Sequence, residues 1–242
     1  NASYGAAFGA TCTAFGAAHL RTLACDPGCV DLVYHGLDLS RFPAPPVRQT
    51  RAEGAPLSLV SVGRLVEKKG FDRLIAALAL LPGDLPWRWT HIGGGALKTE
   101  MSALADAKGI ADRITWRGAC DQPEVIEEMR RADLFVLPSR IAADGDRDGL
   151  PNVLMEAASQ KLPILSTPVS AIPEFIDDGI EGLLVEDSPE QLAAAIARFA
   201  ALPDGGHALA EAAFVRLQRD FRMQPGINHL ATRLTTMMGP AA

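Results

Sequence analysis

Two carboxylates, Asp148 and Glu156, lie on either side of a segment that predicts the start of a helix. Gly149 and Pro151 between them indicate a turn and a first helical turn, because proline lacks only an N–H group that would have no acceptor there. The free amides and the positive dipole end of such a helix favour a phosphate or another anion. Glu156 would lie about one turn into the helix, where it can accept hydrogen bonds from hydroxyl groups but would repel a phosphate. The segment therefore indicates a site for an anionic ligand that also carries hydroxyl groups.

A basic segment upstream has residues that suit a diphosphate. It follows an apolar run, 57–62, that is expected to form a strand. Gly63 allows the backbone to approach a ligand closely, Arg64 offers a planar fork of N–H donors, and Lys69 adds a point charge. Taken by itself, the segment could equally be a solvated basic turn before a helix that begins at Phe71. Together, the basic and acidic segments favour a binding function over that structural reading.

The carboxylate pair, with seven residues between its members, resembles the E-x7-E signature of the family 4 (group 1) retaining glycosyltransferases, with Asp148 in place of the usual first glutamate. Gly63, Arg64 and Lys69 are similar to the GRl…KG motif of that family. The segments 33–38 and 41–43 look like the stretch that joins the two domains of these enzymes. The sequence of residues 146–157 is most similar to that of bacterial exopolysaccharide members of the colanic-acid type. The resemblance implies the two-domain fold called GT-B, of which this chain would be the C-terminal, donor-binding half.

The resemblance also implies a role for each matched residue. Arg64 and Lys69 would hold the diphosphate of a nucleotide sugar and stabilise the charge that develops on the leaving group. Asp148 would lie beside the transferred sugar, with a side chain one methylene shorter than the usual glutamate. Glu156 would hold the ribose hydroxyls. Arg64, Lys69 and Asp148 are therefore the expected catalytic residues.

Further loops complete the expected donor-binding site. The loop at 93–95 resembles the iGdGp loop of the family and would line the cleft, with Gly94 where an acidic residue is common. The loop after Trp116 would contact the nucleotide base through backbone groups. The segment 170–174 reads Ser-Ala-Ile-Pro-Glu instead of the commoner Gly-Gly-Ile-Pro-Glu, which predicts a stiffer loop. The expected donor-binding residues are Gly63, Gly94, Gly95, Gly118, Ala119, Cys120, Gly149, Leu150, Asn152, Val153 and Glu156.

Alternating strand and helix patterns must position these residues. Candidate strands lie at 57–62, 87–92, 113–116, 133–137, 163–166 and 182–185, and candidate helices at 71–81, 96–108, 123–130, 151–159, 172–176 and 189–200. This alternation predicts an α/β fold with a Rossmann-like, doubly wound parallel sheet that binds ligands at the carboxyl ends of its strands. Upstream, a short strand, a helix at 13–23 and a strand at 30–34 are expected. The tail, 206–238, predicts two helices with a break near Gln224-Pro225-Gly226.

These patterns divide the chain into three parts. Residues 1–45 would be a remnant of an N-terminal domain with the inter-domain segment, 46–203 a Rossmann-like nucleotide-sugar-binding domain, and 204–242 the C-terminal crossover helices. The prolines at 43, 45 and 46 and the polar residues up to Gly54 indicate a linker or an exposed loop. We expect the chain to be part of a longer enzyme whose N-terminal domain binds the acceptor.

Composition limits the partners. A formal net charge of -6 argues against a surface for nucleic acid or for anionic membranes in general, and no apolar run approaches the ~18 residues of a membrane span. Four scattered cysteines fit a reducing cytoplasm. Neither Cys25-x3-Cys29 nor the acidic stretch 144–149 matches a metal motif well, so we expect no metal and no cofactor, and a solvated acidic insertion before Asp148. Among the histidines, only His91 would lie near the cleft.

We therefore expect the donor-binding part of a hexosyltransferase-type enzyme. The whole enzyme would move a sugar from a UDP- or GDP-linked donor to a glycan or lipid-linked acceptor in cell-surface polysaccharide synthesis. It would act in the cytoplasm or, by peripheral association, at the inner face of the membrane. The present part alone would turn over little or no substrate. Two alternatives stay open: a non-catalytic nucleotide-sugar-binding module, and a nucleotide-sugar epimerase with the GT-B fold.

Overall fold

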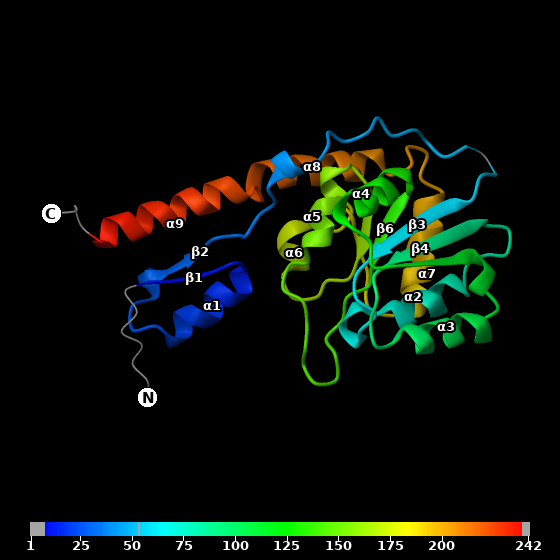
Figure 1. The fold of residues 1–242 in the computed structure, drawn as a ribbon, viewed down its shortest axis with the longest axis horizontal. Coiled ribbons are helices and arrows are strands. Elements are labelled where there is room, and N and C mark those ends of the chain that lie inside the picture. The colour runs from blue at the N-terminus through cyan, green and yellow to red at the C-terminus, as the bar shows by residue number, and fades with distance from the viewer. Residues whose placement is uncertain (1–7, 53, 239–242) are drawn as a thin grey trace.

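A six-stranded parallel sheet forms the centre of the molecule, in the order β5-β4-β3-β6-β7-β8 (Figure 1). The structure, a computed structural model, describes residues 8–52 and 54–238. The chain moves outward from β3 to β5 and then crosses to β6 on the other side of β3, so the sheet is doubly wound as predicted. The strands are β3 (Leu57–Val62), β4 (Trp87–Ile92), β5 (Ile114–Gly118), β6 (Leu134–Leu137), β7 (Ile164–Ser166) and β8 (Leu183–Leu184).

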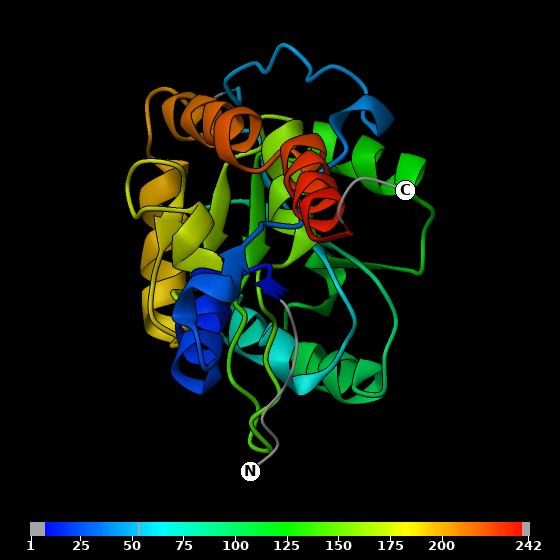
Figure 2. The same ribbon diagram turned by 90° about the vertical axis from the view of Figure 1, so that its left-hand side faces the viewer.

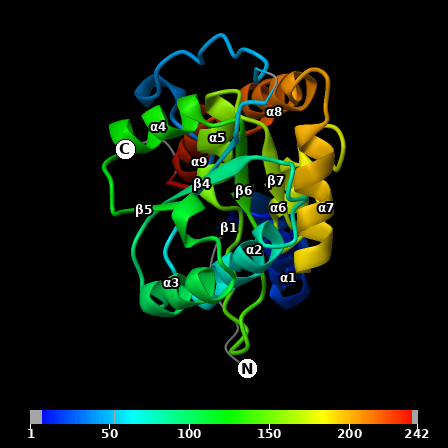
Figure 3. The same ribbon diagram turned by 90° about the vertical axis from the view of Figure 1, so that its right-hand side faces the viewer.

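Helices cover both faces of this sheet, as Figure 3 shows with α2 and α3 below the strands and α4 and α5 above them. On one face α2 packs against α3 and α7, and on the other face α5 packs against α4 and α8. The short helix α6 also contacts α8. These helices are α2 (Phe71–Leu78), α3 (Lys98–Ala107), α4 (Gln122–Arg131), α5 (Asn152–Ser159), α6 (Ile172–Phe175), α7 (Pro189–Ala200) and α8 (His207–Asp220).

Burial on both faces explains why the central strands are apolar without alternation. All four residues of β6 are buried, and β3 pairs with β4 along its whole length, from Leu57–Trp87 to Val62–Ile92. Ser61, a polar residue in the otherwise largely apolar β3, is hydrogen-bonded. The Ser61 hydroxyl accepts a hydrogen bond from the Trp89 indole and donates one to the Val136 carbonyl. The core therefore holds the three middle strands in a fixed register.

A small N-terminal unit lies beside the carboxyl edge of the sheet. It contains β1 (Gly9–Thr11), α1 (Ala14–Leu23) and β2 (Val30–Leu32), and its two strands pair in parallel. The last helix, α9 (Met223–Met238), extends from α8 and lies along this unit, as Figure 1 and Figure 2 show. Asp31 in β2 lies 3.1 Å from His229 and 3.3 Å from Arg233 of α9. The C-terminal helix thus contacts the N-terminal end of the chain.

Glu174 in α6 links the small N-terminal unit to the part of the molecule that contains the sheet. Its carboxylate accepts hydrogen bonds from the backbone amides of Ala14 (2.7 Å) and Phe15 (3.2 Å), the first two residues of α1. Those amides have no acceptor within the helix, and the positive end of the helix dipole favours a carboxylate. Burial and a hydrogen bond to Glu174 raise the pKa of Tyr34 to about 12. Glu174 therefore joins two parts of the molecule that are far apart in sequence.

Two arginines fix the segment that leads into β3. Arg48 donates hydrogen bonds to three carbonyl groups at the C-terminal ends of α4 and α5, and Arg51 donates to two further carbonyl groups. Burial lowers the pKa of Arg48 to about 10. The neighbouring Val47 is 94% exposed. The segment expected as a linker or exposed loop is therefore exposed at some residues and firmly held at others.

The predicted strands and helices of the sheet are confirmed within a few residues at their ends. The tail also forms two helices, as predicted. Helix α8 ends at Asp220 and α9 begins at Met223, so the break lies two residues before the predicted Gln224-Pro225-Gly226. Pro225 and Gly226 belong to the first turn of α9, where a proline is tolerated. The division of the chain at 46 and 204 stays a prediction.

Candidate functional site

Two adjacent loops at the carboxyl edge carry most of the predicted site residues. Strands β3 and β6 are neighbours, although the chain enters them from opposite halves of the sheet. The loop after β3 carries Gly63, Arg64 and Lys69, and the loop after β6 leads through Asp148 into α5. In α/β sheets, ligands bind outside the carboxyl ends of the strands at such a reversal of strand order. The topology thus brings two distant parts of the sequence together.

The predicted cation and the predicted carboxylate meet directly. Lys69 Nζ lies 2.7 Å from Asp148 Oδ2, and the stem of Lys69 runs past Gly63. Lys68 Nζ lies 3.5 Å from Asp148 Oδ1 and 3.0 Å from Asp146 Oδ1. The side chains of Lys68 and Lys69 are 12% and 11% exposed. The hydrogen bond to Asp146 raises the pKa of Lys68, so its ammonium group is charged at neutral pH.

One oxygen of Asp148 keeps an unused hydrogen-bonding capacity. Asp148 Oδ2 is buried and receives no hydrogen bond of good geometry from the described residues, although Lys69 Nζ is close to it. At 2.7 Å the two groups form a close ion pair. A buried carboxylate oxygen in this state can accept a hydrogen bond from a hydroxyl group that approaches the carboxyl edge.

Further contacts tie the basic and acidic loops to each other. The backbone amide of Arg140 donates to the Lys68 carbonyl (2.8 Å), and its Nε donates to the Glu67 carbonyl (3.0 Å). The Glu67 carboxylate accepts a hydrogen bond from the Ala143 amide (3.0 Å), and Asp72 accepts one from the Arg140 guanidinium (3.1 Å). The stretch expected as a solvated acidic insertion is thus bound to the basic loop. Residues 143–147 are exposed, as that expectation requires, but their attachment to a loop more than seventy residues away was not expected.

The glycine-rich loop after β4 packs on the basic loop. Gly93 has a φ of +135°, and a Cβ there would lie 2.0 Å from the Gly63 carbonyl oxygen. A Cβ on Gly95 would lie 2.4 Å from the Leu65 carbonyl oxygen, whereas Gly94 has open space beside it. Close packing between the two loops therefore explains Gly93 and Gly95. Of the three glycines, Gly94 is the one open toward a ligand.

The N-terminal end of α5 offers free backbone donors. Pro151 is its N-cap residue, and the amides of Asn152 and Val153 donate to no acceptor in the described part of the chain. These amides and the dipole of α5 form a favourable environment for an anion. The Asn152 side chain pairs with Nε2 of His35, 2.5 Å away, and Gly149 lies near Thr13 of the N-terminal unit. The helix end thus faces both the acidic loop and the inter-domain segment.

Glu156 lies one turn into α5 and is partly buried. Burial raises the pKa of its carboxyl group, and no neighbouring charge or hydrogen bond contributes to that shift. Arg64 is exposed and forms no ion pair with any described residue. The structure shows no direct contact between Arg64 and Glu156. Both nevertheless follow strands that end at the same edge of the sheet, so a ligand lying along that edge could reach them.

The predicted base-contacting loop lies at the outer end of the same edge. Gly118 ends β5, the edge strand, and has a φ of +71°; Ala119 is exposed and Cys120 packs partly against the core. None of these residues contacts the pair formed by Lys69 and Asp148. Their contact with a nucleotide base stays a prediction.

His91 is buried beneath the basic loop. Its ring lies against Phe71, Trp89 and Trp116, with centroid distances of 4.6, 5.8 and 5.4 Å. Burial, followed by the charge of Lys98, lowers the pKa of His91 to about 4. The nearby Gly63 carbonyl raises the pKa of His91, but by less than burial lowers it. Neither ring nitrogen has a hydrogen bond of good geometry to the described residues. His91 is therefore a neutral core residue that supports the loop from below.

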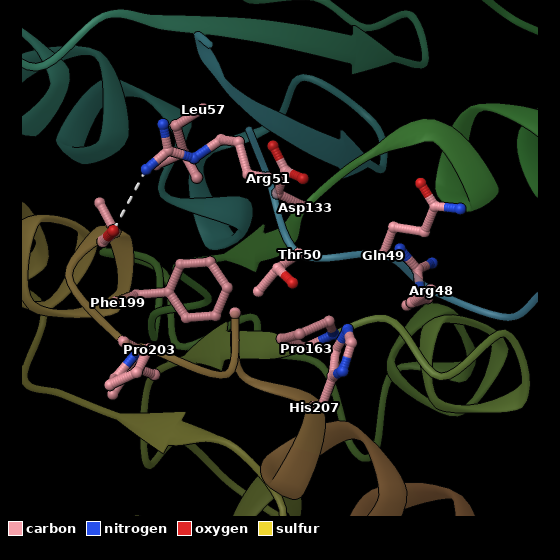
Figure 4. Close-up of a pocket in the computed structure, with 13 residues that line it drawn as sticks. Arg48, Gln49, Thr50, Arg51, Leu57, Asp133, Pro163, Phe199, Pro203 and His207 are labelled. Atoms are coloured by element: carbon pink, nitrogen blue, oxygen red, sulfur yellow. Dashed lines mark hydrogen bonds between the residues drawn. The ribbon is translucent and has the colours of Figure 1, made fainter. Parts of the chain in front are cut away.

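A small cavity lies at the opposite, amino edge of the sheet (Figure 4). This cavity of about 120 Å³ is bounded by residues at the starts of the strands, Leu57, Asp133 and Pro163, and by Arg51 and the ring of Phe199. Its arginines donate to backbone carbonyl groups, so their N–H groups are already in use. No motif of the sequence maps to it. The open carboxyl edge, and not this cavity, gathers the predicted residues.

Neither 8–52 nor 54–238 contains a helix both long and apolar enough to span a membrane. In the same ranges, no three side chains of His, Cys, Asp or Glu gather as metal ligands would. Asp146, in the stretch that imitates a calcium loop, binds Lys68 instead.

The fold and the edge motifs define a class of glycosyltransferase. The sequence profile of the family described as "Glycosyl transferases group 1" matches residues 47–216, which is more than half of the chain. The chain therefore belongs to the group 1 glycosyltransferases, and the predicted GT-B relationship is confirmed.

Similar proteins narrow this class. WcaL of Salmonella typhimurium, named as a colanic acid biosynthesis glycosyltransferase, is 33% identical over 224 residues, covering 91% of this chain and 54% of WcaL. AmsK of Erwinia amylovora, named as an amylovoran biosynthesis glycosyltransferase, is 39% identical over 143 residues, covering 58% of this chain and 35% of AmsK. The predicted similarity to exopolysaccharide enzymes is confirmed. The chain spans about half the length of these relatives.

Solved structures support the fold. HepE of Anabaena, in complex with UDP, superposes with a TM-score of 0.80 at 16% identity, covering 97% of this chain and 65% of HepE. The C-terminal domain of the group 1 protein LpcC of Francisella tularensis superposes with a TM-score of 0.65 at 22% identity, covering 78% of this chain and all of that domain. At such identities these similarities concern the fold alone.

Proposed function

We propose that the carboxyl edge binds a nucleotide diphosphate sugar, and that the longer protein transfers the sugar, with retention of its anomeric configuration, to a glycan or lipid-linked acceptor. The ion pair between Lys69 and Asp148 is the observation that carries this proposal. A cation suited to a diphosphate and a carboxylate lie 2.7 Å apart, next to the free amides of α5. The structure of HepE with UDP and the names of WcaL and AmsK support it.

Each side chain has a stated task in this proposal. Lys69, the exposed Arg64 and the α5 amides stabilise negative charge on the diphosphate as the bond to the sugar breaks. Asp148 accepts hydrogen bonds from the sugar hydroxyls through Oδ2, and Glu156 accepts them from the ribose. Neither a metal nor a cofactor takes part. The whole enzyme, of hexosyltransferase type, would act in cell-surface polysaccharide synthesis, in the cytoplasm or at the inner face of the membrane.

A thermal-shift screen of UDP-, GDP- and ADP-sugars, followed by calorimetry, tests donor binding. We expect one nucleotide to stabilise the protein. Losing one charge-assisted contact should cost about 1.5–3 kcal/mol of binding free energy in Arg64→Ala or Lys69→Ala. Lys108→Ala, which removes an exposed lysine that forms no ion pair with the described residues, is the matched control. Equal affinities in all four proteins would reject the assigned roles.

Two outcomes separate the alternatives. Conversion of a free nucleotide sugar into its epimer by the full-length protein would favour an epimerase. Binding without transfer in a full-length protein with an intact N-terminal domain would favour a binding module. We further expect the present chain alone to show little or no transferase activity, because acceptor binding is assigned to the other domain. Full activity of this chain would contradict that assignment.

A further inference from the structure

Four side chains at the carboxyl edge form a connected network of alternating charge. Asp148 is shared between two lysines, with Oδ1 facing Lys68 and Oδ2 facing Lys69. Lys68 in turn bridges Asp148 and Asp146. The motif that identifies the family assigns a task to Lys69 alone, so the charges on Lys68 and Asp146 need another explanation.

Binding of a diphosphate would disturb one half of this network. The proposed function draws Lys69 toward the phosphate oxygens, which compete with Asp148 for the same ammonium group. The incoming negative charge would also repel the Asp148 carboxylate. Without a second cation, Asp148 would lose its counter-ion at the moment when it must face the sugar. Lys68 is the cation that can stay with it.

The surroundings of Lys68 hold it in place for this task. Its carbonyl group accepts a hydrogen bond from the Arg140 amide (2.8 Å), and its ammonium group lies 3.0 Å from Asp146. Asp146 belongs to a tight turn, since its amide donates to the Asp144 carboxylate (2.9 Å) and its carbonyl accepts from the Ala142 amide (2.9 Å). The side chain of Lys68 is 12% exposed. Its position is therefore set by backbone contacts that a ligand does not need to break.

We propose that Lys68 and Asp146 are positioning residues, which hold the Asp148 carboxylate toward the sugar while Lys69 binds the diphosphate. This inference rests on the proposed function of the site. It explains how a carboxylate one methylene shorter than the family's glutamate keeps a defined orientation. It also gives the acidic turn before Asp148 a purpose: Asp146 prevents Lys68 from following Lys69 to the phosphates.

Calorimetry can separate positioning of the sugar from binding of the phosphates. The informative quantity is the ratio of the dissociation constant of the free nucleoside diphosphate to that of its sugar conjugate, for UDP with UDP-glucose and GDP with GDP-mannose. We expect Lys68→Met to lower this ratio about tenfold while the affinity for the nucleoside diphosphate changes less than threefold. Asp146→Asn should lower the ratio less, and Lys68→Arg should restore most of it.

Matched controls and contrary outcomes are defined for this experiment. Lys108→Met and Asp106→Asn remove exposed charges in or next to α3 and should leave the ratio unchanged. An unchanged ratio in Lys68→Met would overturn the proposal. So would an equal loss of affinity for both ligands with a lowered melting temperature, because that pattern indicates a loop support only.

A second measurement distinguishes failure of this inference from failure of the proposed function. If the parent protein binds no nucleotide sugar, the proposed function fails. If the parent protein does bind one, inorganic pyrophosphate is titrated while the carboxyl ¹³C resonance of Asp148 is followed by NMR. A resonance that stays sharp in the parent and broadens in Lys68→Met supports the positioning role. Identical behaviour of the two proteins would refute it.

Discussion

The two edges of the sheet each hold a pair of basic side chains, but the two pairs bind different partners. At the amino edge, Arg48 and Arg51 donate to neutral backbone carbonyl groups. At the carboxyl edge, Lys68 and Lys69 face the carboxylates of Asp146 and Asp148. A carbonyl group at the end of a buried helix needs its donor, whereas a carboxylate can be exchanged for a phosphate. Basic pairs therefore indicate an anion site only where their present partners are themselves anions.

The largest expected effect is on stability at the amino edge. Arg48→Ala removes the donor of three carbonyl groups, which are then left without a partner in a poorly hydrated place. We expect a loss of about 3 kcal/mol in the free energy of unfolding, measured by urea denaturation. The affinity of the folded protein for nucleotide should not change. Arg88→Ala, at an exposed position of β4, is the control, and an equal loss in both variants would contradict the capping role.

Lowering the pH should reduce the stability that His91 contributes near the carboxyl edge, but not the stability that Arg48 contributes at the amino edge. The pKa of His91 is about 4 in the folded protein, against 6.5 as its ordinary value, so between these values the unfolded chain binds a proton that the folded protein rejects. The stability that His91 contributes is complete above pH 6.5 and falls by about 3 kcal/mol as the pH drops to about 4. Arg48 stays protonated throughout this range, since its pKa is about 10.

The variant His91→Leu checks this pH dependence. It replaces the titrating imidazole with an apolar side chain of similar size. Unfolding experiments between pH 7 and pH 4 should show a shallower decline than in the parent protein. Parallel curves for the two proteins would mean that His91 is accessible to protons in the folded state.

Lys69→Ala should give the opposite pattern to Arg48→Ala. The affinity for the nucleoside diphosphate should fall by about 2 kcal/mol, because a charge-assisted contact is lost. The free energy of unfolding should change by about 1 kcal/mol or less, because Asp148 keeps Lys68 as its counter-ion and is not left as an unpaired charge. Calorimetry and urea denaturation on the same sample measure both. A large loss of stability with unchanged affinity would mean that Lys69, like Arg48, stabilises the fold and does not bind the nucleotide.

The smallest expected effect concerns Glu156. Burial raises the pKa of this carboxyl group, so the folded protein holds a proton more tightly than the unfolded chain does. Stability should therefore decrease as the pH rises from the ordinary value of a glutamate to its raised value in the folded protein. Glu156→Gln should remove this decrease and stabilise the protein at pH 7 by about 1 kcal/mol or less. The same variant should bind the nucleotide more weakly, which calorimetry can detect.

Local patterns in the sequence were sufficient for the sheet. The strands 57–62 and 87–92 were predicted with their observed bounds because buried apolar residues end sharply at a glycine or follow a proline. The break between the tail helices was predicted within two or three residues, although Pro225 itself fits either a break or a first turn. Gly63, Lys69 and Asp148 could be proposed as site residues because their types and spacing are characteristic, and the structure brings them together at one edge.

The contacts between distant loops could not be predicted. Nothing in the local sequence shows that Lys68 reaches Asp146, that Arg140 binds the carbonyl of Glu67, or that Glu174 caps α1. Each depends on how β3, β6 and α6 are placed in the sheet. Lys68 is visible in the sequence as the neighbour of Lys69, but two consecutive lysines do not reveal which carboxylate each of them faces.

The ion pair between Lys69 and Asp148 has a consequence for selectivity among anions in the cell. If the carboxyl edge binds a nucleotide diphosphate sugar as proposed, its own negative charge should make it attract chloride or a single sulfate only weakly, because either would have to displace a carboxylate attached to the protein. A ligand with several phosphate oxygens and hydroxyl groups would compensate both partners at once. Donor binding would then be an exchange of one anion for another, which would keep the site available among abundant small ions.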